Sequence, residues 1–162
     1  MSFLRRLRLL LPLSVVAVIA IVLVSACGSG PPQQQTGRRC AACGMDVDGE
    51  PEWIARIDYT DGSSDFFDGP KCLFKSIHGM SKQKRRLPQS EVATIYVTTY
   101  YDQVSIPAQR ATYVYGSDVL GPMGRELVPL ASRAEAEEFL RDHHGRGIVR
   151  FDEITPEFLR SM

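Results

Sequence analysis

The chain has 162 residues, and its 19 basic and 19 acidic residues cancel to a formal net charge of zero at pH 7. Three of the basic residues and none of the acidic ones lie in the first 26 residues, so the remainder has 16 basic and 19 acidic residues and a net charge of −3. A mildly acidic chain lacks the broad basic surface that nucleic-acid binding needs, which excludes that class of partner.

The N-terminal segment predicts an exported lipoprotein. Three arginines within Arg5–Arg8 precede the apolar run Leu9–Val24, and two small residues then precede Cys27. This order is typical of a secretory signal over residues 1–26, with an uncleaved N-terminal anchor helix as the alternative. A Cys at this point resembles the bacterial lipoprotein signal, in which the Cys is lipidated and becomes the new N-terminus. We therefore expect Cys27 to anchor the chain to a membrane, facing the periplasm or the cell exterior.

Residues 27–39 are predicted to be a flexible tether. The segment "GSGPPQQQTGRR" (Gly28–Arg39) is rich in Gly, Pro and Gln and has no apolar periodicity. Folded structure is expected from Cys40, and the chain from Cys27 to Met162 is long enough for one ordinary domain or two very small ones.

The first folded segment predicts a hairpin followed by a helix and a strand. Trp53–Tyr59 alternates between apolar and polar side chains, as a half-buried strand does, and the Asp-Gly pair within Thr60–Ser63 favours a turn into a return strand, Ser64–Phe67. Asp68-Gly69-Pro70 is typical of a turn and helix start, and Gly79 marks the helix end. Asp68 is expected to serve this turn and helix start, with support of a metal ligand as the alternative. Val92–Tyr101 is rich in β-branched and aromatic residues and predicts a strand.

The second segment predicts a shorter version of the same plan. Ser132 and Glu135 form a capping box ahead of a helix that ends near Gly145. The other expected elements are a strand at Ala111–Tyr115, a loop at Gly116–Val128, a strand at Ile148–Phe151 and a short turn from Thr155. The sequence thus predicts an α+β fold of two small related halves, residues 40–103 and 104–162.

The thiols outside the lipid anchor are odd in number. Removing Cys27 from the four cysteines leaves Cys40, Cys43 and Cys72. Three cysteines cannot all pair in disulfides, so at least one thiol stays free, and in an oxidising compartment it needs burial or a ligand.

The motif "CAACGM" (Cys40–Met45) allows four interpretations. Structural zinc needs four ligands, and Cys72 with His78 makes a poor second pair. Thiol–disulfide exchange usually places Cys-x-x-Cys after a strand, at a helix start, whereas here a tether precedes it. A protective disulfide is the third interpretation, and soft-metal binding is the fourth.

Soft-metal binding accounts best for the Met. Monovalent copper favours thiolate and thioether sulfurs, and Cys43 and Met45 would lie on the same side of an extended backbone that Gly44 allows to bend. Met123, between Gly-Pro and Gly, is a further candidate, although its spacing alone favours a core-filling role.

Four segments in order resemble one family. They are Cys43-Gly44-Met45, "DGSSDFFDGP" (Asp61–Pro70), "TTYYDQVSIPAQRATYVYGSDVLGPMGRELVPL" (Thr98–Leu130) and "IVRFDEI" (Ile148–Ile154). Together with the lipoprotein signal, they make the chain similar to the NosL family of nitrous oxide reductase maturation lipoproteins. The resemblance covers the chain from about Cys40 to Ile154.

The resemblance implies a Cu(I) carrier rather than an enzyme. Its partner would be nitrous oxide reductase, another copper enzyme or the associated maturation machinery, and its fold would be related to that of organomercurial lyase. The implied copper ligands are Cys43, Met45 and Met123, which replaces the core-filling role of Met123, and Cys40 is an additional candidate. The alternative function is a thiol-based enzyme, either a disulfide oxidoreductase or an organomercurial-lyase-like enzyme that uses Cys40, Cys43 and Asp68.

Overall fold

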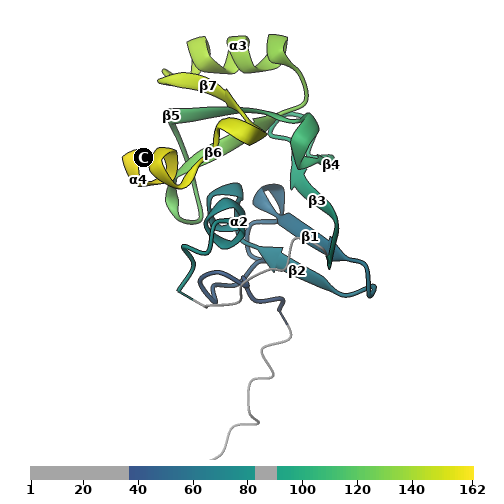
Figure 1. The fold of residues 1–162 in the computed structure, drawn as a ribbon. Coiled ribbons are helices and arrows are strands. Elements are labelled where there is room, and N and C mark those ends of the chain that lie inside the picture. Colours follow the sequence, from purple (N-terminus) through teal and green to yellow (C-terminus); the bar gives the residue numbers. More distant parts are fainter. Residues whose placement is uncertain (1–36, 83–90) are drawn as a thin grey trace, which may run out of the picture. The chain divides into compact units, whose positions relative to one another are not determined.

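The computed structural model describes residues 37–82 and 91–162, and all of these belong to one compact unit, Gly37–Met162 (Figure 1). The signal sequence, Cys27 and the tether up to residue 36 lie outside the described residues. Within the described part of the chain, no helix is long and apolar enough to cross a membrane.

Two antiparallel sheets form the fold. The first has the strand order β2-β1-β3-β4 and the second β6-β5-β7. The strands are β1 (Ala55–Tyr59), β2 (Ser64–Phe67), β3 (Val92–Thr98), β4 (Ser105–Pro107), β5 (Thr112–Gly121), β6 (Gly124–Leu130) and β7 (Gly147–Arg150). The helices are α2 (Pro70–Ile77), α3 (Arg133–Asp142) and α4 (Pro156–Ser161), with short 3-10 turns η1 (Pro51–Trp53), η3 (Ala108–Arg110) and η4 (Phe151–Glu153).

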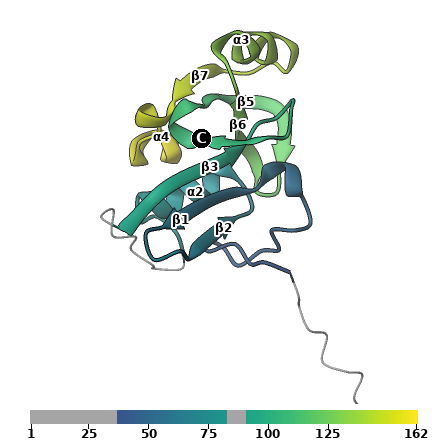
Figure 2. The same ribbon diagram turned by 90° about the vertical axis from the view of Figure 1, so that its right-hand side faces the viewer.

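Each sheet carries a helix. α2 packs on β1 and β2 and also contacts β6 of the second sheet, whereas α3 packs on β5, β6 and β7 (Figures 1 and 2). The mixed α/β architecture with two antiparallel sheets and few helices confirms the predicted fold class. The relation to organomercurial lyase stays a prediction.

The first predicted hairpin is present, because apolar and polar side chains alternate along its first strand. Ala55, Ile57 and Tyr59 are buried along β1, whose residues pair with β2 from Ala55↔Phe67 to Asp58↔Ser64. The strand starts two residues later than predicted, because Pro51–Trp53 form a 3-10 turn before it. The core around these residues includes Phe74 of α2 and residues from both sheets.

The predicted loop at Gly116–Val128 is wrong. These residues extend β5 and form most of β6, and only Pro122 and Met123 make the turn between the paired Gly121 and Gly124. The glycines that suggested a loop are hairpin features instead. Gly124 has φ +76°, which L side chains rarely adopt, and Gly116 lies where the β5–β6 register shifts.

Three other elements differ from the prediction. β4 and η3 were not expected, and β4 pairs with β3, so the first sheet continues past residue 103 into the second predicted half. The expected turn after Thr155 is the helix α4, whose first turn is capped by the Thr155 side chain. The capping box was right, since Ser132 Oγ accepts a hydrogen bond from Glu135 N at 3.2 Å.

Candidate metal centre

The Cys40–Met45 motif lies in a narrow loop with a paired base. Arg39 and Asp46 form an isolated antiparallel bridge, and Cys40 N donates to Met45 O at 2.8 Å. Gly44 N donates to Cys40 O at 2.8 Å, and Gly44 has φ +83°. The backbone between Cys43 and Met45 is therefore turned and not extended as expected, and glycine is required at its centre.

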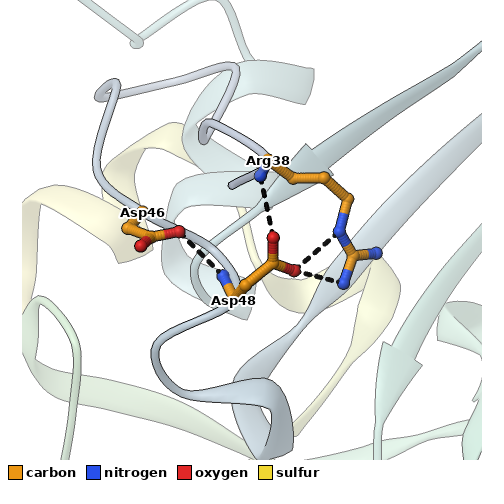
Figure 3. Close-up of polar contacts among 3 residues, drawn as sticks. All are labelled: Arg38, Asp46 and Asp48. Carbon is orange, nitrogen blue, oxygen red and sulfur yellow. Dashed lines mark hydrogen bonds and ion pairs between the residues drawn. The ribbon is translucent and has the colours of Figure 1, made fainter. Parts of the chain in front are cut away.

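Arg38 and Asp48 close the base of this loop (Figure 3). Arg38 donates from Nε to Asp48 Oδ1 at 2.7 Å and from its backbone N to Oδ2 at 2.8 Å. The Arg38 hydrogen bonds lower the pKa of Asp48, and Asp46 Oδ1 accepts from Asp48 N at 3.1 Å. Arg38 and Arg39, the last two residues of the predicted tether, thus belong to the fold, because they hold the loop that carries the thiols.

Asp68 lies beneath the loop and contacts two of its thiols. Cys40 Sγ donates to Asp68 Oδ1 at 3.1 Å, and Cys43 Sγ donates to Oδ2 at 3.2 Å. Asp68 is 1% exposed, between the end of β2 and the start of α2. Gly69 is the N-cap of α2 and makes no side-chain cap bond, so Asp68 lies in the bend just before the helix and its carboxylate contacts the thiols.

Cys72 completes the cluster from the first turn of α2. The ligand atoms of Cys40, Cys43, Asp68 and Cys72 all lie within 4.8 Å of one another. Cys40 and Cys72 are 1% and 3% exposed, Cys43 is half-buried, and all three thiols are free. The sequence missed Cys72 as a member of the cluster, although its i, i+4 spacing from Asp68 and the odd thiol count were available signals.

The thiols differ in their readiness to ionise. A hydrogen bond from the Cys72 thiol lowers the pKa of Cys40 to about 6. Burial raises the pKa of Cys43 to about 12, and the hydrogen bond to Cys40 raises the pKa of Cys72. Cys40 is therefore the first thiol of the cluster to become a thiolate, the form that binds metals.

The two candidate Met residues lie at the surface. Met45 is 43% exposed in the Cys loop, and Met123 is 37% exposed in the β5–β6 turn. Lys71 Nζ donates to Met123 O at 2.8 Å, and this bond holds the β5–β6 turn against α2. Lys71 directly precedes Cys72 on that helix. The proposed second zinc pair is separated, because His78 Nε2 bonds to Ile154 O at 2.7 Å, while Cys72 faces the other cysteines.

Comparison with known proteins identifies the family. The model of the NosL family matches residues 31–159. The chain belongs to the NosL family. No curated protein matches it. Among solved structures, the copper chaperone NosL from Shewanella denitrificans aligns at 24% identity with a TM-score of 0.59, over 78% of this chain and 99% of that one, which supports the fold of this NosL family member.

The donor chemistry suits a soft ion. Three sulfurs within 4.8 Å, two of them in a loop with an exposed thioether, match the ligands that monovalent copper prefers. Asp68 is the mismatched member, since carboxylate oxygen is a hard donor. It orients two thiols through hydrogen bonds, and in a zinc complex it would be able to act as the fourth ligand.

Proposed function

We propose that this chain is a lipid-anchored, extracytoplasmic Cu(I) carrier that passes copper to nitrous oxide reductase, another copper enzyme or its maturation machinery. The observation that carries the proposal is the cluster of three free thiols, two of which share a loop with the exposed Met45. Membership of the NosL family and the likeness to a copper chaperone support it.

The exposed sulfurs favour transfer over storage. Cys43, Met45 and Met123 are the proposed ligands, and two of these three are neutral thioethers at the surface. A thioether binds Cu(I) without adding a negative charge and is harder than a thiol to lose to disulfide formation. A partner's ligands would reach the ion from solvent and replace the thioethers one at a time, so the chain carries copper without chemical turnover.

The proposed location follows from the N-terminal sequence. Lipidation at Cys27 would hold the carrier at a membrane, and the segment up to Arg39 would let the metal loop reach a membrane-associated or soluble acceptor. Globomycin treatment of cells that express the chain tests this point. It should cause an unprocessed form to accumulate, whereas Cys27→Ser should yield a form that no longer incorporates labelled palmitate.

Copper binding is tested by anaerobic competition with a chromophoric Cu(I) chelator, using the full-length chain in detergent. Met45→Leu and Met123→Leu each remove a proposed thioether ligand and should change the affinity for Cu(I) or the rate of its release, whereas Met80→Leu, a partly buried core position, should change neither. A parallel Zn²⁺ titration is needed, because three thiolates and a carboxylate also suit zinc. A chain that retains Zn²⁺ and does not bind Cu(I) would refute the assignment.

A second function is favoured by one observation, the two hydrogen bonds from Cys40 and Cys43 to Asp68. A thiol pair beside a proton carrier is the arrangement needed for cleaving a carbon–mercury bond. Two thiolates would take the mercury, the carbon–mercury bond would break, and the carbon would receive a proton that Asp68 had accepted from one thiol. The second thiol proton would leave to solvent.

Methylmercury turnover separates the two functions. An enzyme would release methane at a rate that Asp68→Asn abolishes and Met123→Leu leaves unchanged. A carrier would bind the mercurial without turnover. Methane release by the wild-type chain would therefore favour the enzyme over the carrier.

A further inference from the structure

Cys43 belongs to two groups of sulfurs at different depths. On its inner side lie Cys40 and Cys72, both almost fully buried, with all three sulfurs within 4.8 Å of one another. On its outer side lies Met45, two residues further along the loop and 43% exposed. Cys43 itself is half-buried, so its exposure is intermediate between that of the inner thiols and that of Met45.

The second half of the fold supplies the other outer sulfur. The turn that carries Met123 is held to α2 by the Lys71 Nζ bond to Met123 O. A second bond joins β6 to the same helix, because Glu126 Oε1 accepts from Lys71 N at 2.6 Å. Cys72 follows Lys71 directly, so the β5–β6 turn that carries this exposed Met is held beside the helix turn that carries an inner thiol.

We propose that a bound Cu(I) ion has two positions that share Cys43: an outer one completed by Met45 and Met123, and an inner one formed with Cys40 and Cys72. This inference rests on the proposed copper-carrying function and deepens it. The ion would move between the positions by exchanging thioethers for thiols while it stays bound to Cys43.

The two positions should differ in strength. The inner position offers up to three thiolates, whose negative charges attract Cu(I) more strongly inside the protein than at the surface. The outer position offers one thiolate and two neutral thioethers. The inner position should therefore hold the ion tightly, whereas the outer one should release it quickly to an acceptor that approaches from solvent.

Asp68 is a positioning residue for the inner position. Its two oxygens each accept one hydrogen bond, from Cys40 and from Cys43, so it fixes the separation of both sulfurs. As a hard donor it does not suit Cu(I) as a ligand. Asp68→Asn keeps the shape and should keep sulfur-only ligation, but should increase the disorder of the copper–sulfur distances.

The test combines affinity, release rate and X-ray absorption on the full-length chain in detergent. With the Met residues replaced by selenomethionine, a copper–selenium contribution reports the outer position alone. The wild type should show a partial copper–selenium contribution. Cys72→Ser should increase the copper–selenium contribution and weaken Cu(I) binding by at least about tenfold. Release of the ion from this variant to the chelator should remain fast. The double variant Met45→Leu/Met123→Leu should abolish the copper–selenium contribution. It should keep tight Cu(I) binding through the inner thiols and slow the release of the ion to the chelator.

Matched variants separate loss of a ligand from loss of structure. Ser76→Ala changes a similarly buried position on the same helix and should alter none of the three readouts. If Cys72→Ser does not fold, Cys40→Ser provides the same test from the loop side.

The outcomes also separate this inference from the carrier function. A chain that binds Cu(I) with affinity and copper–sulfur shell unchanged by both Cys72→Ser and Cys40→Ser would overturn the inner position and leave the carrier function standing. A wild-type chain that does not bind Cu(I) would refute the carrier function itself.

Discussion

Glu126 should make the stability of the fold decline between pH 4.5 and about 7. Its carboxyl lies at the start of β6, 1% exposed, where Oε1 accepts hydrogen bonds from Lys71 N at 2.6 Å and Leu127 N at 3.1 Å. Oε2 is buried and has no hydrogen-bond partner among the residues that the structure describes. Burial raises the pKa of Glu126 from 4.5 to about 7, although Lys71 and both amides oppose the shift.

The sign follows from where the proton is held. Between pH 4.5 and 7 the unfolded chain releases the proton and the folded chain retains it, so unfolding is coupled to proton release and becomes more favourable as the pH rises. The contribution is fully present below pH 4.5 and is lost by about pH 7. At about 1.4 kcal/mol per pH unit, this interval corresponds to about 3 kcal/mol of unfolding free energy.

Urea denaturation followed by Trp53 fluorescence measures the effect. Trp53 is the single tryptophan, and its ring lies 3.2 Å from where a Cβ on Gly121 would be, close to the Glu126 side chain. The wild type should lose about 3 kcal/mol relative to Glu126→Gln between pH 4.5 and 7, because the amide cannot ionise. Other carboxyls contribute equally to both chains and cancel in the difference. A difference that stays constant across this range would refute the assignment of a protonated Glu126.

Three further predictions concern the loop Cys40–Met45, its base at Arg38 and Asp48, and the buried cluster around Phe139. Gly44→Ala should lower the unfolding free energy by about 1 kcal/mol, because Gly44 has φ +83°, and should weaken Cu(I) binding in a chelator competition. Gly62→Ala is the control, because Gly62 has φ +85° in a remote turn; it should cause similar strain without weakening copper binding. Asp48→Asn should leave the urea midpoint nearly unchanged, because the pair with Arg38 is exposed and screened; a large shift would contradict this. Phe139→Ala should lower the unfolding free energy by about 3–5 kcal/mol in the same assay, since the ring is fully buried and packs edge-on against Tyr100 at 4.9 Å, and unchanged stability would refute its core role.

Local patterns predicted the elements whose causes are local. The alternation along Ala55–Tyr59 and the Ser132–Glu135 capping box each act within a few residues, and both appear as expected. The hairpin of Gly116–Val128 was missed because its glycines mark a register shift and a two-residue turn, and strand pairing over the whole hairpin outweighs their composition.

The residues of the candidate site show the same difference between local and long-range causes. Cys40 and Cys43 were recognisable as neighbours in one motif, whereas Asp68 and Cys72 join them from about 30 residues further on, through contacts that only the packing of α2 against the loop creates. Local rules assigned Asp68 to the helix start. Its carboxylate contacts the thiols instead, and the helix obtains its amide acceptor from Glu126, 55 residues away from Lys71 in sequence.

Through these two contacts of Glu126 and Asp68, the two sheets are joined beside the thiol cluster. Glu126 caps α2 from β6, and Lys71 Nζ bonds to the carbonyls of Met123 and Arg125 in return. Because Glu126 serves the helix amide, Asp68 is released from capping and its oxygens are available to Cys40 and Cys43. The buried acid that lowers stability near neutral pH is therefore also the residue that allows the thiol cluster to form beside the Met123 turn. A carrier that draws ligands from both halves would need such a link, since neither half contains the complete set.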